Sequence, residues 1–301
     1  MYERKRSKLG KVPIISRTIP ISINLSSQPK SINATITLET TIWEMESPSD
    51  MIQTWWTVEE TDRAAIADPF GVVVWPGSIV ASQELMKRHY TAWNVTTNAA
   101  ATTVSPMDNL TVLVLGAGTG VEVQIAALLG AKQVIATDIN PFTLKLLDYG
   151  ASQIFGSDGP TSNVVESKLF TDKLAIDPIQ DFDVYSNEQL PQFDILIAAD
   201  VLYNANLAKQ IGLRLYESIS RSLANDAQFP KVIVADSQKF HGTNFLLEVP
   251  ELVGLNNMLY ENGLDVLRWE EIKLVNVTTS GVVIDEDQEY DVNVRLLSWG
   301  W

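Results

Sequence analysis

Three glycines at alternate positions form the first group of residues that could do chemistry. Gly116, Gly118 and Gly120 follow the apolar run Val112–Leu115 and precede Val121–Leu129, which is apolar or small apart from Glu122. This order predicts a buried strand, a tight turn and the N-terminus of a helix, which together can cradle a nucleotide-like ligand. Glycine is required because both the turn and the approach of the ligand leave no room for a Cβ.

A carboxylate closes the next predicted strand, Gln133–Asp138, and Asp138 lies 18 residues after Gly120. An acidic residue at about this distance can accept hydrogen bonds from both hydroxyls of a ribose. The alternative is an ordinary exposed residue at a strand end. A dinucleotide fingerprint would need a glycine at position 121, where the chain has Val121, so a dehydrogenase is disfavoured.

The elements that must position these residues alternate between strand and helix. After the glycine turn we expect helices over about 142–155, 206–223 and 246–262, the last with breaks near Pro250 and Gly254. Strands are expected at 193–200 and 231–236, and a third strand somewhere in 164–184, ending near Asp183. Two long antiparallel strands, 272–277 and 290–299, follow. The pattern predicts an α/β fold with a doubly wound, mostly parallel seven-stranded sheet and an antiparallel C-terminal β-pair.

The N-terminal part divides into two segments ahead of this domain. Residues 1–12 are basic and polar and are expected to form a flexible tail. Residues 13–67 begin with an alternation of apolar and polar side chains up to about Thr41, which predicts a β extension of two or three strands. A helix is expected over Ile79–Met86 and a loop over Ala92–Asp108, so the main domain spans 68–301.

Composition excludes several classes of site. The chain has 301 residues, no Cys and two His, which excludes disulfides, thiolate chemistry and a His-rich zinc site. No apolar run reaches the ~20 residues of a membrane span, and no signal peptide is recognised at the N-terminus. We therefore expect a cytoplasmic protein, with a nuclear location as the alternative, that has no membrane partner.

The net charge is −15, and it is unevenly distributed. Residues 1–30 contain seven Lys or Arg and one Glu, so the remainder of the chain carries −21. Such a field repels nucleic acid phosphates and attracts cations or basic proteins. Solubility alone is the other explanation.

Three motifs, in order along the chain, resemble a known family. The glycine turn after Val112–Leu115 resembles the first motif of class I S-adenosylmethionine-dependent methyltransferases. Asp200-Val201-Leu202-Tyr203 resembles the Asp-x-x-Tyr motif of methyltransferase family 16, a eukaryotic group consisting largely of protein lysine methyltransferases, and Val74–Ser78 resembles its Trp-Pro segment. The resemblance covers about residues 68–300 and implies S-adenosyl-L-methionine as the cofactor, with no metal.

The resemblance also implies roles for individual residues. Asp200 and Tyr203 would lie beside the methionine part of the cofactor and the entering amine, and would act in catalysis. The residues implied in cofactor binding are Trp75, Gly116, Ala117, Gly118, Gly120, Asp138 (ribose), Ile139, Asp183 (adenine) and Ala199. The alternatives are that Asp200 is a strand-end cap, Tyr203 a core aromatic residue and Trp75 simple packing.

We expect an enzyme that methylates a lysine amine of a locally basic protein, acts as a monomer and binds no nucleic acid. A small-molecule N-methyltransferase on the same fold and a non-catalytic cofactor-binding module are the alternatives. Variable loops form the substrate face, so the sequence separates these alternatives poorly. The Asn-Pro-Pro-Tyr-type motif of nucleic acid amino-methyltransferases is absent after the strand at 193–200.

Overall fold

The computed structural model describes thirteen segments of the chain. They are residues 4–25, 34–46, 70–97, 105, 107–138, 140–155, 168–173, 192–202, 205–225, 227–237, 250–263, 271–280 and 289–301. None of the helices in these segments has the length and apolar character needed to span a membrane.

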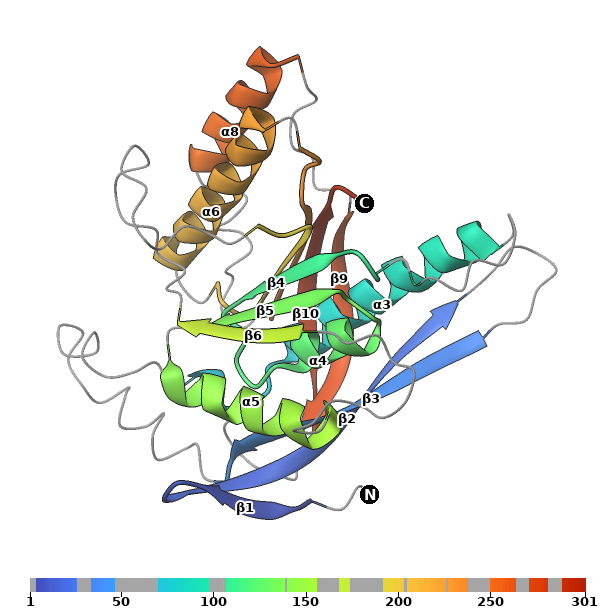
Figure 1. Ribbon diagram of the computed structural model, residues 1–301, viewed down its shortest axis with the longest axis vertical. Coiled ribbons are helices and arrows are strands. Elements are labelled where there is room, and N and C mark those ends of the chain that lie inside the picture. Colours follow the sequence, from blue (N-terminus) through green and yellow to red (C-terminus); the bar gives the residue numbers. More distant parts are fainter. Residues whose placement is uncertain are drawn as a thin grey trace.

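A seven-stranded sheet forms the centre of the molecule (Figure 1). Its spatial order is β6 (Lys168–Lys173), β5 (Gln133–Asp138), β4 (Thr111–Leu115), β7 (Ile195–Ala199), β8 (Lys231–Ser237), β10 (Glu289–Trp299) and β9 (Glu271–Ser280). The first five strands are parallel, and β10 is antiparallel to both of its neighbours. The expected mostly parallel sheet with an antiparallel C-terminal pair is confirmed.

Helices cover both faces of this sheet. On one face lie α3 (Pro76–Thr97), α4 (Val121–Leu128) and α5 (Pro141–Phe155), and on the other α6 (Ala205–Ala224) and α8 (Pro250–Glu261). Successive side chains of β4 point to opposite faces, so Val112 and Val114 join the core beneath α3 and α4 while Leu113 and Leu115 join the core beneath α6. Burial on both faces explains why the strand is a continuous apolar run.

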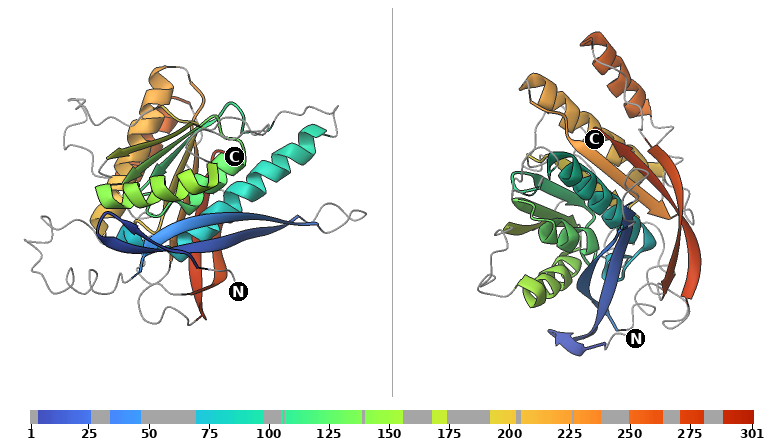
Figure 2. Two further views of the ribbon diagram at one scale, coloured as in Figure 1. Left: turned by 60° about the horizontal axis from the view of Figure 1, so that its bottom comes forward. Right: turned by 90° about the vertical axis from the view of Figure 1, so that its right-hand side faces the viewer.

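The N-terminal residues form a second, three-stranded antiparallel sheet of β1 (Arg6–Leu9), β2 (Val12–Leu25) and β3 (Ala34–Met45). Figure 2 shows this sheet lying across the outer side of α3, α4 and α5, as a further layer. Ile21 and Ile42 are fully buried in the same core as α3 and α4. The expected β extension is therefore packed against the main domain.

The expectation of a flexible tail over residues 1–12 is wrong for residues 6–9, because these residues form β1. Gly10, with φ 63°, makes the tight turn that lets Leu9 pair with Val12, and both apolar side chains pack on the core. Pairing and burial together hold this basic segment in the sheet.

Three element boundaries also differ from expectation. Helix α3 continues to Thr97, so the loop expected from Ala92 begins later. Pro250 starts α8 instead of breaking a helix, because proline is favoured in the first turn, where its missing N–H is not needed. The third strand, β6, ends at Lys173, so the expected strand end near Asp183 is wrong.

Candidate active site

The topology of the sheet identifies the edge at which a ligand can bind. The chain runs outward from β4 through β5 to β6, and then returns to the other side of β4 as β7. Ligands of open α/β sheets bind beyond the carboxyl ends of the strands at such a reversal. The candidate site therefore lies where β4 and β7 end, at Leu115 and Ala199. We call this region the carboxyl edge.

The glycine turn lies at this edge, directly after β4. Gly116, Gly118 and Gly120 have φ of 63°, 53° and 86°, a region that side chains other than glycine rarely adopt. Ala117 N donates a 2.8 Å hydrogen bond to Thr137 O of β5, which fixes the turn to the sheet. Helix α4 starts at Val121 without a side-chain cap, so its first N–H groups remain suited to an anionic or polar ligand.

Asp138 joins the end of β5 to the glycine turn. Its Oδ2 accepts a 3.1 Å hydrogen bond from Gly118 N, and its Oδ1 accepts a 2.8 Å hydrogen bond from Asn140 N. The buried Oγ1 of Thr143 has no hydrogen-bond partner among the described residues, and a Cβ on Gly71 would lie 2.9 Å from it and 3.4 Å from Asp138 Oδ2. A carboxylate and an unpartnered hydroxyl beside a position restricted to glycine fit the ribose of a nucleoside.

Hydrogen bonds on both sides of Trp75 hold the Trp-Pro segment in place. Val74 N donates a 2.8 Å hydrogen bond to Glu44 Oε1 of β3, and Gly77 N donates a 2.5 Å hydrogen bond to Asp200 Oδ2. Between them, Trp75 Nε1 donates to Phe70 O at 2.8 Å, and the two rings meet edge to face. Trp75 is partly buried against the N-terminal sheet and α5. Its expected contact with a cofactor stays a prediction.

Asp200 follows the last residue of β7 and has φ 50°, the one positive value for a residue other than glycine in the described segments. Its Oδ1 accepts a 2.5 Å hydrogen bond from Ser237 N at the end of β8, so both carboxylate oxygens bind backbone N–H groups. Burial raises the pKa of Asp200 from 3.8 to about 6, although the hydrogen bonds from Ser237 and Gly77 oppose that rise. Asp200 thus joins β7, β8 and the start of α3.

Glu122, which was not among the predicted site residues, also lies at this edge. Its side chain is 1% exposed, and its Oε2 has no hydrogen-bond partner in the part of the chain that the structure describes. Burial raises its pKa to about 7; its own backbone and the Ser78 side chain oppose the rise, and the Asp200 charge adds to it. The sequence signal was an acid in the first turn of the helix that follows the glycines.

Two carboxyl groups therefore lie near the starts of α3 and α4 and the end of β7. Such an arrangement favours positively charged ligands, because a cation stabilises both ionised carboxylates. Among the described residues, no group of His, Asp and Glu could hold a metal ion.

The remaining predicted site residues divide into two groups. Ala117 and Ala199 are buried at the carboxyl edge, 2% and 6% exposed. Tyr203, Ile139 and Asp183 lie outside the described residues.

The fold and the glycine turn define a class I S-adenosylmethionine-dependent methyltransferase, and the cofactor is S-adenosylmethionine. A family model described as lysine methyltransferase matches residues 59–246, more than half of the chain. The chain belongs to this family, methyltransferase family 16. No curated protein matches it.

Solved structures with a related fold have low sequence identity to this chain. A protein from Pyrococcus horikoshii, proposed to be an RNA methyltransferase, is 15% identical with a TM-score of 0.42, over 84% of this chain and 96% of its own. Magnesium protoporphyrin IX methyltransferase from Synechocystis with bound SAH is 16% identical with a TM-score of 0.38, over 83% and 99%. An arsenic(III) S-adenosylmethionine methyltransferase from Chlamydomonas reinhardtii is 17% identical with a TM-score of 0.35, over 64% of each chain.

Proposed function

We propose that this methyltransferase transfers the methyl group to the ε-amine of a lysine in a protein substrate. The observation that carries the proposal is the match to the lysine methyltransferase family over residues 59–246. The carboxyl edge supports it, because Asp200 and the buried Glu122 place two acidic groups there, and negative charge at this edge would favour a cationic side chain.

The cofactor supplies a methyl group that is already activated on a sulfonium, so alignment with the nucleophile is the main requirement. Gly116, Gly118 and Gly120 would accommodate its backbone, and Asp138 would accept hydrogen bonds from its ribose. Because the methyl group is already activated, no side chain of the protein has to activate it further.

The substrate lysine arrives mostly protonated, because a free lysine amine has a pKa of ~10.4. The protein must therefore bind the ammonium form and let it lose a proton before methyl transfer. Asp200, whose pKa of about 6 leaves it ionised at neutral pH, can orient the ammonium through the lone pairs not used by Ser237 and Gly77. Water can then carry the proton away, so Asp200 need not be a strong base. Tyr203 is proposed to line the same entrance.

Labelling of a protein extract tests the proposal. The purified chain, extract proteins and radiolabelled S-adenosylmethionine should give label on lysine, identified by mass spectrometry. The control is Asp138→Ala, which should label poorly because it loses the ribose contact. Methyl groups found only on small metabolites would instead support the small-molecule alternative, and label on arginine or histidine would make the lysine assignment wrong.

A further inference from the structure

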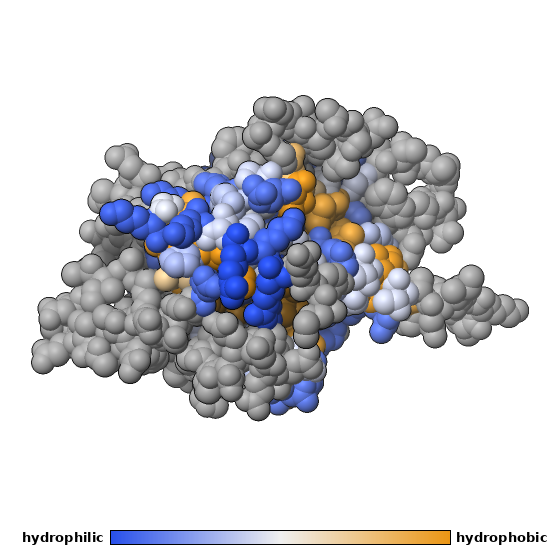
Figure 3. All heavy atoms as spheres, turned by 90° about the horizontal axis from the view of Figure 1, so that it is seen from below, coloured by the Kyte–Doolittle hydropathy of each residue, from blue (hydrophilic) through white to orange (hydrophobic). Residues whose placement is uncertain are grey.

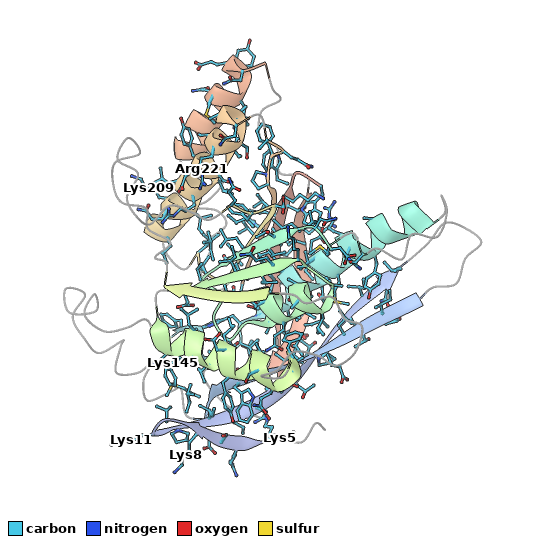
Figure 4. The ribbon with its side chains drawn as sticks, viewed as in Figure 1. Lys5, Lys8, Lys11, Lys145, Lys209 and Arg221 are labelled. Carbon is cyan, nitrogen blue, oxygen red and sulfur yellow. The ribbon has the colours of Figure 1, made fainter. Side chains whose placement is uncertain are left out.

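Positive charge gathers on one surface of this acidic protein. Lys8 and Lys11 are exposed on the hairpin of β1 and β2, and Lys145 is exposed on α5. Figure 4 shows these three lysines on the same side of the molecule, away from Lys209 and Arg221 on α6. We call Lys8, Lys11 and Lys145 the basic rim.

The buried neighbours of these lysines hold the hairpin and the helix together. Leu9 and Val12 pack in one cluster with Leu146, and Ser7 Oγ lies 3.1 Å from the Tyr149 hydroxyl. Because Lys8, Lys11 and Lys145 are each adjacent in sequence to a member of this cluster, their positions are set by folded structure. Figure 3 views the molecule from the side of β1 and shows hydrophilic side chains gathered at the centre of that face.

The charges of the basic rim are not neutralised by the described part of the chain. Arg6, nearby on β1, pairs with Glu46 at 2.6 Å, whereas Lys8, Lys11 and Lys145 form no ion pair with any described residue. Lysine on an edge strand such as β1 also prevents pairing with other sheets. That explanation covers Lys8 but not Lys145, which lies on a helix.

The basic rim adjoins the carboxyl edge. Helix α5, which carries Lys145, starts at Pro141, three residues after the ribose-binding Asp138. The cluster beneath the rim also contains Val72 and Trp75 of the Trp-Pro segment. A ligand that enters at the carboxyl edge would therefore have the rim beside it.

We propose that the basic rim binds an acidic segment of the protein whose lysine is methylated. This inference rests on the proposed function. It extends the expected locally basic substrate to one that also carries negative charge: the lysine enters the acidic edge, and a neighbouring acidic segment contacts the rim. Exposed ion pairs contribute little singly, but complementary patches raise the association rate and set orientation.

The same surface is less suited to nucleic acid. Single-stranded nucleic acid binding combines basic grooves with aromatic side chains on which bases stack. Among the described residues the large exposed apolar side chains are Tyr260, Leu274 and Tyr290, on α8, β9 and β10, and none lies on the rim. The net charge of −15 also repels a long polyanion, whereas a short acidic peptide need only contact the rim.

The test compares two variants with equal change in net charge. The rim variant is Lys8→Glu, Lys11→Glu, Lys145→Glu. The control variant is Lys87→Glu, Lys132→Glu, Lys209→Glu, at three exposed lysines elsewhere on the surface. A fluorescein-labelled poly-L-glutamate peptide is the probe, and fluorescence anisotropy measures its affinity at low ionic strength. Wild type and control variant should bind alike, while the rim variant should bind at least ~10-fold more weakly.

Equal weakening in both variants, or none in the rim variant, would overturn the inference. So would an oligouridylate that binds more tightly than poly-L-glutamate and depends on the same three lysines, since the rim would then be a nucleic acid site. Methyl transfer to extract proteins supplies the second measurement. The rim variant should lose kcat/KM while its affinity for S-adenosylhomocysteine stays at the wild-type value.

The two proposals can fail separately. If the rim binds poly-L-glutamate as expected but wild type labels no protein lysine, the proposed function is wrong and the acidic-ligand site remains. If lysine labelling is as fast in the rim variant as in wild type, the docking of substrate on the rim is wrong and the proposed function remains.

Discussion

Replacing Glu44 with alanine should weaken cofactor binding, although Glu44 lies in the N-terminal sheet. Its carboxylate, 8% exposed, accepts the hydrogen bond from Val74 N at 2.8 Å and lies 3.7 Å from Arg17 Nη1. Val74 is 2% exposed, so no water replaces the lost partner without a rearrangement. Because Trp75 follows Val74 directly, the expected rearrangement moves the Trp-Pro segment.

The size of the effect follows from the contact that is lost. A buried N–H left without an acceptor costs about 1–3 kcal/mol, which lowers the melting temperature of a chain of this size by several degrees. If about half of that free energy appears as displacement of the Trp-Pro segment, affinity for S-adenosylhomocysteine falls roughly 3- to 10-fold. Glu44→Gln keeps an oxygen acceptor and loses only the charge, so it should lie between wild type and Glu44→Ala.

Calorimetry measures both quantities, with differential scanning for stability and isothermal titration with S-adenosylhomocysteine for affinity. The titrations are carried out well below the melting temperature of each variant, so that wild type and variants are equally folded. If Glu44→Ala melts earlier but binds S-adenosylhomocysteine as wild type does, the hydrogen bond stabilises the fold without positioning the site. If neither quantity changes, the contact itself is unimportant.

Three further predictions concern the carboxyl edge. Gly120→Ala should cost about 2–5 kcal/mol, because its Cβ would lie 2.7 Å from Leu147 Cγ at φ 86°, whereas Gly10→Ala, at φ 63° with no atom within 4 Å, should cost only about 1–2 kcal/mol in urea unfolding. Burial raises the pKa of Glu122 from 4.5 to about 7, so the unfolded chain ionises first and stability is lost as pH rises from about 4.5 to about 7. Glu122→Gln, which does not ionise, should melt near the wild-type temperature at pH 4 and above it at pH 8.5, a difference corresponding to roughly 3 kcal/mol. An equal difference at both pH values would contradict the assignment. Because burial raises the pKa of Asp200 to about 6, kcat/KM with a protein substrate should fall as pH drops through that value. Asp200→Asn should be slow at every pH and should not show this fall in kcat/KM at low pH. If the variant still shows the fall, another group is responsible for it.

Some of the site is local in the chain and could be predicted from it. The glycine turn, the strand before it and Asp138 at the end of the next strand lie within about thirty residues, and their periodicity is set by neighbours in the sequence. The continuous apolar runs of β4 and β7 indicate strands buried on both faces, which requires the helical layers that α4 and α6 supply. The cofactor class follows from these local features.

Other features depend on which distant segments meet. The partners of Asp200 are Gly77, 123 residues earlier, and Ser237, 37 residues later, so no local pattern predicts that both carboxylate oxygens bind backbone N–H groups. The raised pKa of Glu122 likewise results from burial by distant segments, and the charge of Asp200, far along the chain, adds to it. The third strand lies within the expected range, but its end was misplaced because its sequence is weakly patterned, and pairing with β5 decides its position.

The N-terminal sheet shows this division most clearly. Alternating apolar residues determined its strands, because the period of two belongs to the strand itself. Its packing on α3, α4 and α5, the hydrogen bond from Val74 to Glu44, and the approach of Lys8 and Lys11 to Lys145 were decided only by the tertiary structure. Burial and charge proximity are properties of surfaces brought together in space, and a periodic pattern specifies which side of an element is apolar without specifying what covers it.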